Sequence, residues 1–584
     1  MFNFSLSNYA PSMALVMTLI ASFAALGPVP AQPTPALIED WRASDFNYAS
    51  SMMDTDQSDH VVVLGDTATS RNLIIKKFDA AGALLWQTPY DAVEALSGVW
   101  IAVDGNGNAV VQANTIRIST GQPTGWLTLK YDADGTLLWA NSRPGVVSGS
   151  VRVEVDANDN IYVAGFALND SVLIKYSPTG ATLWTAVFDN NGAIDAPSSM
   201  AISPDGSRIA VAGVSGNLFM ALMYDANGNR LWANTNSAVY AAGDAAFGPG
   251  NISYFAAGAY FPQDPNPYQM AIVKFDAAGN QLWIKSYSVG DRTMRVALDA
   301  QGNIVATGVD SIGYMDWMTI KTDANGNLLW SQRYDGGRNN DETPSMLAVD
   351  ASGAVYVTGK GGPNPGSGNL SYVKGVAVKY NPDGTPQWAV WDDYAGGKAI
   401  RLGAANTLAT LGWNYLVTTH YTQTSLPDLL PNPPTNLSGF ASNTGSGYEV
   451  RLNFSDNANN EFWVEAERCA GSGCTDFTTV AQSRGENVTA LTDTTVAQGV
   501  AYTYRVRARG FMGLSGPSNT ATIIIPGVIC PDFNHDGVVD AADLSAIASL
   551  WGQPAPAGYD LDGDGSVTIA DIQMAAARWG ASCP

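Results

Sequence analysis

The sequence predicts a mainly β protein built largely from one repeated unit, with a small helical segment near its C-terminal end. Three observations lead to this prediction. A ten-residue phrase, clearest as KYDADGTLLW at residues 130–139, returns seven times at intervals of about fifty residues, a period typical of repeat architectures. A second phrase, clearest as VDANDNIYVAG at residues 155–165, alternates with it. Two twelve-residue segments rich in Asp and Gly follow near the end of the chain.

Each copy of the first phrase predicts a β-hairpin. A β-rich run leads to a turn that opens with Asp, Asn or Ser. Gly follows three residues after this turn residue, and Trp follows four residues after the Gly, as at Asp132, Gly135 and Trp139. Asp at the first turn position and Gly in the left-handed position are typical of a type I turn with a G1 bulge. The recurring Trp is expected to pack between neighbouring repeats as a core residue, not to bind a ligand.

The two phrases together give four strands in each period of about 45 to 58 residues, which is the size of one β-propeller blade. Trp41 lies 45 residues before Trp86, so residues 38–46 are expected to complete the last blade and to remove its open edge. The sequence therefore predicts eight blades over residues 36–424, with seven as the alternative.

The repeat resembles the bacterial SBBP-type propeller family, whose members are secreted and mostly of unassigned role. An eight-bladed ring with Trp-bearing turns is also similar to the pyrroloquinoline quinone dehydrogenases. The adjacent-cysteine disulfide of those enzymes has no counterpart in residues 36–424. The sequence also shows no set of cofactor ligands, so the repeat looks closer to the SBBP-type family and no cofactor is expected in the propeller.

The stereotyped turns are expected on one face of the ring, which leaves the variable connections 260–269, 334–345 and 360–372 on the other. Variable loops on a rigid scaffold are common binding sites. The alternative is that these loops pack only on themselves. The aromatic side chains that could stack there on polysaccharide or peptide are Tyr260, Phe261, Tyr268 and Tyr372.

The N-terminal segment predicts export. Residues 13–26 form an apolar run long enough for a signal sequence and too short to span a bilayer, and residues 29–31 offer a small-residue cleavage site. No Lys or Arg precedes Arg42, so the usual positive start is missing. We expect a signal peptide over residues 1–31, a secreted or cell-surface protein, and no transmembrane helix.

The four cysteines fit an oxidising compartment. Three pairings are possible, and the placement of the cysteines in separate domains favours Cys469 with Cys474 and Cys530 with Cys583. The formal net charge of −23, with no basic track, argues against nucleic acid as a partner.

The sequence offers few residues suited to catalysis. The three histidines, His60, His420 and His535, lie in different segments, which leaves little for a Ser-His-Asp triad or a His-based metal site. The sequence does not exclude glycoside hydrolysis by a pair of carboxylates, because the separation of two carboxylates in space is not visible in a sequence.

A Pro-rich linker, residues 425–432, ends the repeat region. Residues 433–526 then alternate as short strands spaced like those of a small β-sandwich. The segment resembles a fibronectin type III domain, chiefly in AYTYRVRA, where Tyr502 matches the tyrosine-corner position, and in SGPSNTA. Phe454 stands where that family has a Trp. Such modules are mostly spacers and adhesive surfaces.

Residues 532–543 and 560–571 form two loops with oxygen donors at positions 1, 3 and 5, Gly at position 6 and Asp at position 12. Ca²⁺ prefers six to eight oxygen ligands, and this spacing places alternate side chains and one backbone carbonyl around an ion. Two Ca²⁺ ions are expected. The predicted ligands are Asp532, Asn534, Asp536, the Val538 carbonyl and Asp543 in the first loop, and Asp560, Asp562, Asp564, the Ser566 carbonyl and Asp571 in the second.

A calcium loop followed by one helix, twice, with Asp at position 12, resembles a type I dockerin, here over residues 530–584. Helices are expected at 541–551 and 569–579. The resemblance implies a cohesin-like module or a cell-surface scaffold as partner, usually in polysaccharide-degrading systems. The recognition pair at positions 10 and 11, often Ser-Thr in that family, is Ala541-Ala542 in one copy and Ile569-Ala570 in the other.

Two functions fit these features. In the first, the protein is a secreted, non-catalytic binding or adhesion protein with a recognition propeller and a calcium-dependent anchor. In the second, the propeller is a polysaccharide hydrolase or lyase that the dockerin-like module delivers. The scarcity of catalytic side chains favours the first.

Overall fold

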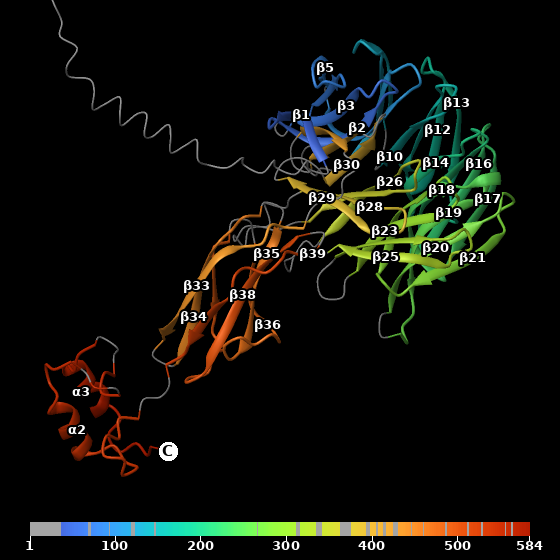
Figure 1. Ribbon diagram of the computed structural model, residues 1–584. Helices are drawn as coiled ribbons and strands as arrows, with labels where there is room; N and C mark the ends of the chain where they lie inside the picture. The colour runs from blue at the N-terminus through green and yellow to red at the C-terminus, as the bar shows by residue number, and fades with distance from the viewer. Residues whose placement is uncertain are drawn as a thin grey trace, which may run out of the picture.

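A computed structural model describes residues 37–583 except for short gaps at 68–71, 93, 118–122, 145–147, 265–266, 311–315, 335–341, 362–374, 393–396, 404–406, 413–415, 424–429, 445–446, 459–460, 485–487, 511–512, 527–529, 555, 557 and 562–564. The expected signal peptide, residues 1–31, lies outside the described residues. Figure 1 shows a large β region, a second β unit and a small helical unit in chain order.

The described residues between 37 and 423, which we call the repeat region, form eight four-stranded antiparallel sheets. Sheets 1 to 4 consist of β2 (Tyr48–Thr55), β3 (Val61–Thr67), β4 (Leu73–Phe78) and β5 (Leu84–Tyr90); β6 (Ala95–Val103), β7 (Ala109–Ile116), β8 (Pro123–Tyr131) and β9 (Leu137–Pro144); β10 (Ser148–Val155), β11 (Ile161–Ala167), β12 (Asp170–Tyr176) and β13 (Thr182–Phe188); and β14 (Asp195–Ile202), β15 (Arg208–Ser215), β16 (Leu218–Asp225) and β17 (Arg230–Asn236).

Sheets 5 to 8 consist of β18 (Val239–Phe247), β19 (Ser253–Tyr260), β20 (Tyr268–Phe275) and β21 (Gln281–Tyr287), with a short 3₁₀ turn at Pro249–Asn251; β22 (Arg292–Leu298), β23 (Ile304–Asp310), β24 (Asp316–Thr322) and β25 (Leu328–Tyr334); β26 (Thr343–Val349), β27 (Val355–Lys360), β28 (Gly375–Tyr380) and β29 (Pro386–Asp392); and β30 (Gly397–Leu402), β31 (Thr407–Gly412), β32 (Leu416–Gln423) and β1 (Leu37–Asp45).

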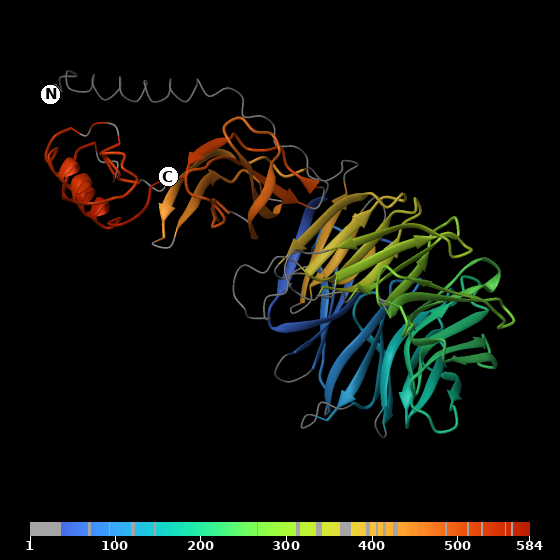
Figure 2. The ribbon, with the colours of Figure 1, turned by 90° about the horizontal axis from the view of Figure 1, so that it is seen from below.

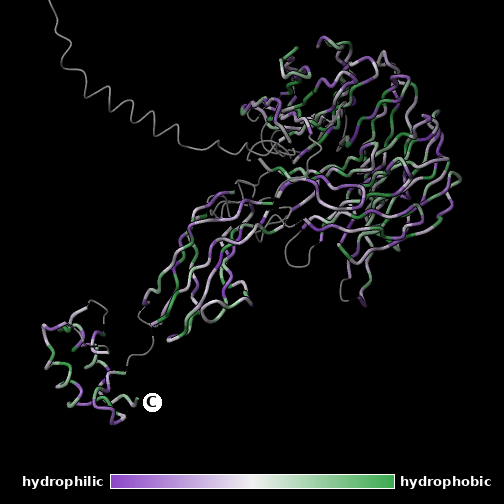
Figure 3. The backbone as a smooth tube through the Cα atoms, in the orientation of Figure 1, coloured by the Kyte–Doolittle hydropathy of each residue, from purple (hydrophilic) through white to green (hydrophobic). Residues whose placement is uncertain are grey.

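Neighbouring sheets meet through their first strands. β2 contacts β6, β6 contacts β10, and the series continues through β14, β18, β22, β26 and β30 back to β2. The middle strands are buried along nearly their whole length, as in β3 and β4. Figure 3 shows apolar stretches, in green, throughout the repeat region. The core of the repeat region therefore lies between successive sheets.

The outer hairpin of each repeat has the turn chemistry that the sequence predicts. In sheet 2 the register shifts by one residue between Lys130 and Tyr131, which is the expected bulge. The N–H of Gly135 donates to the carbonyl of Asp132 at 3.1 Å, and Gly135 has a φ of 87°. An L-residue rarely adopts this left-handed conformation, which explains why Gly recurs at this position.

The recurring tryptophans pack between neighbouring sheets, as expected, although most are only half-buried. Trp86 of sheet 1 lies on the turn of sheet 2, where a Cβ added to Gly135 would be 2.6 Å from the indole Cδ2. Its Nε1 donates to the carbonyl of Ala133 at 2.8 Å. The same hydrogen bond to the next sheet's turn is made by Trp41, Trp139, Trp184 and Trp330.

The N-terminal strand belongs to the last sheet. β1 pairs antiparallel with β32, from Leu37 opposite Gln423 to Asp45 opposite Leu416. In Figure 2 the dark blue strand lies beside the yellow-orange strands at the end of the region. Trp41 stacks on His420 with ring centroids 5.5 Å apart and donates to the carbonyl of Ala80 in sheet 1. The first and last strands thus complete one sheet together.

The second unit is a two-sheet β-sandwich. One sheet contains β33 (Thr435–Asn443), β34 (Tyr448–Ser455) and β37 (Ala490–Asp493), and the other contains β36 (Thr478–Arg484), β35 (Glu461–Ala470), β38 (Ala501–Gly510) and β39 (Gly513–Leu514), with β40 (Ala521–Ile524) paired to β38. Phe454 lies in the core between them. The hydroxyl of Tyr502 accepts a hydrogen bond from the N–H of Ala497, as a tyrosine corner requires.

Two short helices form the C-terminal unit: α2 (Ala541–Ala548) and α3 (Ile569–Ala576). The expected helices at 541–551 and 569–579 are thus each three residues too long. The reason is that the backbone tightens at the end: the N–H groups of Leu550 and Trp551 bond three residues back, and Gly552, with a φ of 72°, ends the turn. Among the described residues, no helix has the length and apolarity needed to cross a membrane.

Candidate calcium centre

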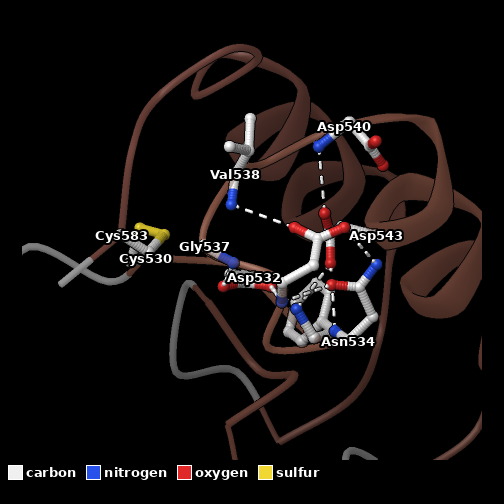
Figure 4. Close-up of a disulfide and its surroundings, with 10 residues drawn as sticks. Cys530, Asp532, Asn534, Gly537, Val538, Asp540, Asp543 and Cys583 are labelled. Atoms are coloured by element: carbon white, nitrogen blue, oxygen red, sulfur yellow. Dashed lines mark hydrogen bonds between the residues drawn. A yellow bond between two sulfur atoms is a disulfide. The ribbon is translucent and has the colours of Figure 1, made fainter.

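The first acidic loop, residues 532–543, is held in a tight curve by its own side chains. The carboxylate of Asp532 accepts from the N–H groups of Asp536 and Gly537, at 3.1 and 2.8 Å. The Oδ1 of Asp536 accepts from the N–H of Val538 at 3.0 Å, and Gly537 has a φ of 92°. The side chains at positions 1, 3 and 5 therefore converge on one side of the loop, as Figure 4 shows for Asp532 and Asn534.

Asp543, at position 12, connects the two ends of this loop. It is fully buried, and its Oδ1 accepts from the N–H groups of Phe533 and Asn534, while Oδ2 accepts from the N–H of Asp540 at 2.9 Å. Burial raises the pKa of this carboxyl, but the backbone N–H donors stabilise the ionised form and hold its pKa below the usual value. These donors therefore favour the ionised form of Asp543, which is the form that binds a cation.

The second loop repeats this arrangement 28 residues later. Asp571 accepts from the N–H groups of Leu561 and Thr568, at 2.6 and 2.7 Å, and Asp560 accepts from the N–H of Gly565 at 2.8 Å. Asp562 and Asp564, two of the predicted ligands, lie outside the described residues. Residues at the same positions of the two loops make the same hydrogen bonds, as the similarity of the two loop sequences predicts.

Each loop pairs with the chain that leaves the other helix. Val539 exchanges backbone hydrogen bonds with Gly580 and Ala581, and Val567 does the same with Gly552 and Gln553. The two pairs of partners are again 28 residues apart, so the halves of the unit are related by an approximate two-fold arrangement. The loops consequently fold as one unit.

A small apolar core supports the loops. Ile547, Leu561, Val567 and Ala575 are buried, and Leu544, Leu550 and Ile572 pack against them. The ring of Phe533, in the first loop, stacks on that of Tyr559, which directly precedes the second, with centroids 4.2 Å apart. This core is too small to hold the unit securely by itself.

Both expected disulfides are present, Cys469–Cys474 in the sandwich and Cys530–Cys583 in the C-terminal unit. Figure 4 shows the second bridge beside the first loop. There the N–H of Cys583 donates to the carbonyl of Gly537 at 2.9 Å. The bridge joins the two ends of the unit and fixes one of them to the loop.

Sequence reasoning missed the residues that start the two helices. Asp540 and Thr568 are the N-caps, and each forms a capping box with the Asp three residues on. In both boxes the carboxylate at the last loop position accepts a hydrogen bond from the backbone N–H of the N-cap residue. The spacing of a capping residue and an acid three positions later could have identified them.

The residues of the first loop fit a hard divalent cation. The predicted donors are carboxylate, amide and carbonyl oxygens, which Ca²⁺ prefers, and neither a thiol nor an imidazole is among them. A carboxylate oxygen that accepts one hydrogen bond keeps a lone pair for a metal. Asp532, Asn534, Asp536, Asp543 and the Val538 carbonyl are the residues that would hold the ion, and an ion there would neutralise the carboxylates that face one another.

Three of the four predicted ligand-face aromatics lie together in the repeat region. Tyr260 and Tyr268 are directly opposed across β19 and β20, with ring centroids 4.9 Å apart, and Phe261 follows in the same hairpin. All three side chains are exposed. Tyr372 lies outside the described residues. The hairpin therefore presents a small aromatic cluster to solvent.

Two cavities open on the opposite face, where the stereotyped turns lie. One, of about 460 Å³, is lined by the turns of sheets 4, 5 and 6, including Asp205, Asn251 and Asp299. The other, of about 360 Å³, is lined by Arg152, Glu154 and neighbouring turn residues. Sequence reasoning considered only the face with the variable loops, because these turns look alike from one repeat to the next.

The geometry of the C-terminal unit defines a module with paired acidic loops, each followed by one helix. Residues 531–578 match the family model of the dockerin type I domain. Domains of that family bind calcium and cohesin modules. The predicted dockerin module is thus supported over this segment.

Several solved structures are similar to parts of the chain. Hydrazine synthase from Kuenenia stuttgartiensis is 10% identical, with 57% of this chain and 96% of that chain covered and a TM-score of 0.38. A Lactobacillus plantarum protein is 15% identical, with 49% and 84% covered and a TM-score of 0.36. A Fn3-like protein from Clostridium thermocellum is 28% identical, with 17% and 98% covered and a TM-score of 0.14. A search of curated proteins returns no match.

Proposed function

We propose that the C-terminal module, residues 530–584, is a calcium-dependent anchor that binds a cohesin-like module on a scaffold or cell surface. The observation that carries this proposal is the match of residues 531–578 to the dockerin type I domain, on a unit whose two acidic loops share one pattern of hydrogen bonds. Calcium would occupy both loops and set α2 and α3 for binding.

The surface of the module supports a protein partner. Trp551 and Trp579, at equivalent positions after the two helices, are both more than half exposed, and Ile569 and Met574 are exposed on α3. Exposed aromatic and Met side chains are typical of protein interfaces. Ile569 stands at position 10 of its loop, in the recognition pair, so we place the partner's contact there.

We further propose that the repeat region is an eight-bladed β-propeller with a non-catalytic recognition role, and that residues 433–526 are a fibronectin type III spacer. The closed series of contacts between first strands and the shared last sheet support the count of eight. The exposed cluster of Tyr260, Phe261 and Tyr268 supports binding of polysaccharide or peptide, because aromatic faces stack on apolar faces of such ligands.

The anchor is tested by calorimetric titration of the full chain with a panel of cohesin modules, with calcium and with chelator. Binding with calcium and none with chelator is expected. Asp532→Ala combined with Asp560→Ala should abolish it, while Asp134→Asn, an exposed turn residue of the repeat region, should leave it unchanged. Binding that survives the double substitution, or no binding to any cohesin, would contradict the proposal.

The recognition role is tested by screening the full chain against a glycan panel for both binding and product release. We expect binding that Tyr260→Ala and Tyr268→Ala weaken, with no product at any time. Release of shortened glycan would overturn the non-catalytic role and establish the alternative, a polysaccharide hydrolase or lyase.

A further inference from the structure

Three carboxylates converge where sheet 3 meets sheet 4, far in sequence from the C-terminal loops. Asp170 begins β12, Asp189 directly follows β13, and Asp195 begins β14. One carboxylate oxygen from each residue lies within 4.8 Å of the others. Figure 1 shows the three labelled strands as neighbours in the repeat region. The cluster therefore combines a hairpin of one sheet with the connection to the next.

Asp195 is the buried member of this cluster. Its side chain has no solvent-exposed area, and its Oδ2 accepts from the N–H of Asn190 at 2.7 Å. Its Oδ1 is also buried and has no hydrogen-bond partner in the described part of the chain. A buried carboxylate oxygen without a partner is costly, so this atom calls for a partner that the described residues do not supply, such as water or an ion.

The charge of the cluster is not balanced by the protein. No Lys, Arg or His among the described residues pairs with Asp170, Asp189 or Asp195. Two other buried carboxylates of the repeat region are paired with lysines: Asp104 with Lys130 at 2.8 Å and Asp299 with Lys321 at 2.9 Å. The cluster thus differs from these sites, because it collects negative charge and supplies no cation.

The backbone holds the three carboxylates together. The N–H of Asp195 donates to the carbonyl of Asn169 at 2.6 Å, which ties β14 to the preceding hairpin. Asp189 accepts from the N–H of Gly192 at 2.7 Å, which fixes the turn of the connecting segment. These two bonds hold Asp189 and Asp195 close to the hairpin that carries Asp170.

We propose that Asp170, Asp189 and Asp195 bind a divalent cation, and that the ion is Ca²⁺. All three donors are carboxylate oxygens, and Asp189 is exposed and Asp170 only half-buried, which leaves room for water ligands. A cation there would supply the partner that Oδ1 of Asp195 lacks. It would also join sheet 3 to sheet 4, so its function is to stabilise this junction.

The test uses the full chain in which Asp532→Ala and Asp560→Ala remove the C-terminal loops as calcium sites. Equilibrium dialysis with radioactive calcium should still detect binding at one site per chain, and calcium should raise the Tm of the repeat region. Asp195→Asn and Asp170→Asn should each abolish both effects. Asp134→Asn, which changes the charge equally at an exposed turn, should preserve them.

Circular dichroism of each variant checks that it is folded, and if Asp195→Asn is not, the exposed Asp189→Asn serves in its place. No calcium binding in the double-substituted chain would overturn the proposal. Binding that persists unchanged in Asp170→Asn and Asp189→Asn would overturn it as well. Because the C-terminal loops are disabled throughout, neither result depends on the anchor.

Discussion

Replacing Gly135 by Ala should weaken the contact between sheets 1 and 2 specifically. Gly135 has a φ of 87°, and the new Cβ would lie 2.6 Å from Cδ2 of Trp86, which no side chain tolerates. Gly302 is a matched control, because it ends the same type of Asp-opened turn with a φ of 80° and has no atom within 4 Å of its Cβ position.

The two substitutions share one cost and differ in another. An Ala in the left-handed region costs about 1 to 2 kcal/mol at either site. At Gly135 the indole must also move, which breaks its hydrogen bond to the Ala133 carbonyl, worth about 1 kcal/mol. Lost burial of the ring adds on the order of 1 kcal/mol. We therefore expect Gly135→Ala to destabilise by about twice as much as Gly302→Ala.

Scanning calorimetry of the full chain measures the two shifts in Tm, and a cycle with Trp86→Ala isolates the contact. In the Trp86→Ala background, Gly135→Ala should cost only what Gly302→Ala costs. Equal shifts for the two glycine variants would refute the reasoning. An undiminished effect of Gly135→Ala without the indole would refute it too.

Deletion of residues 38–46 should lower the Tm of the repeat region well beyond a surface deletion of equal length, because it reopens a sheet edge; a Tm within about two degrees of the parent would contradict the pairing. The isolated segment 530–584 should gain helical circular dichroism with calcium and lose it with chelator, and unchanged spectra would disprove the loop assignment. Cys583→Ser should destabilise that segment by about 4 kcal/mol in chemical denaturation, since the bridge closes a loop with a separation of 53 residues, and a negligible change would contradict this. Burial raises the pKa of Asp104, but its contacts with Lys130 and nearby donors lower it more, to below its usual value. The stabilising effect of Asp104 is therefore complete above the unfolded-state pKa and is lost as the pH falls through the folded-state pKa. Asp104→Asn should therefore lower the Tm at about pH 6 and have a smaller effect at about pH 3, and a constant difference in melting scans would refute the linkage.

The sequence predicts local structure in this chain well, because turn chemistry is local. Asp132 and Gly135 lie within four residues of each other, and the hydrogen bond and positive φ that they form follow from their own side chains. The same holds for the first calcium loop, where Asp532 and Asp536 bond to backbone groups a few residues away. Such features need no knowledge of the rest of the fold.

What the sequence could not predict depends on distant segments. It indicates that Trp86 packs between repeats, but not that the ring lies half-buried on a glycine of the next turn. The Asp170, Asp189 and Asp195 cluster belongs to two sheets, and no spacing rule connects its members. Helix ends were misjudged because the apolar pattern continues through Trp551 after the backbone has left the helix.

The shared last sheet has a consequence for how the protein is made. Asp40 and His420 are in contact at 2.9 Å although 380 residues separate them. At a synthesis rate of about 5 to 20 residues per second, β32 is synthesised about 20 to 80 seconds after its partner strand β1. During that interval the first strand is an unpaired edge that any other strand could capture. The eighth sheet therefore cannot be completed before both ends of the repeat region have been made.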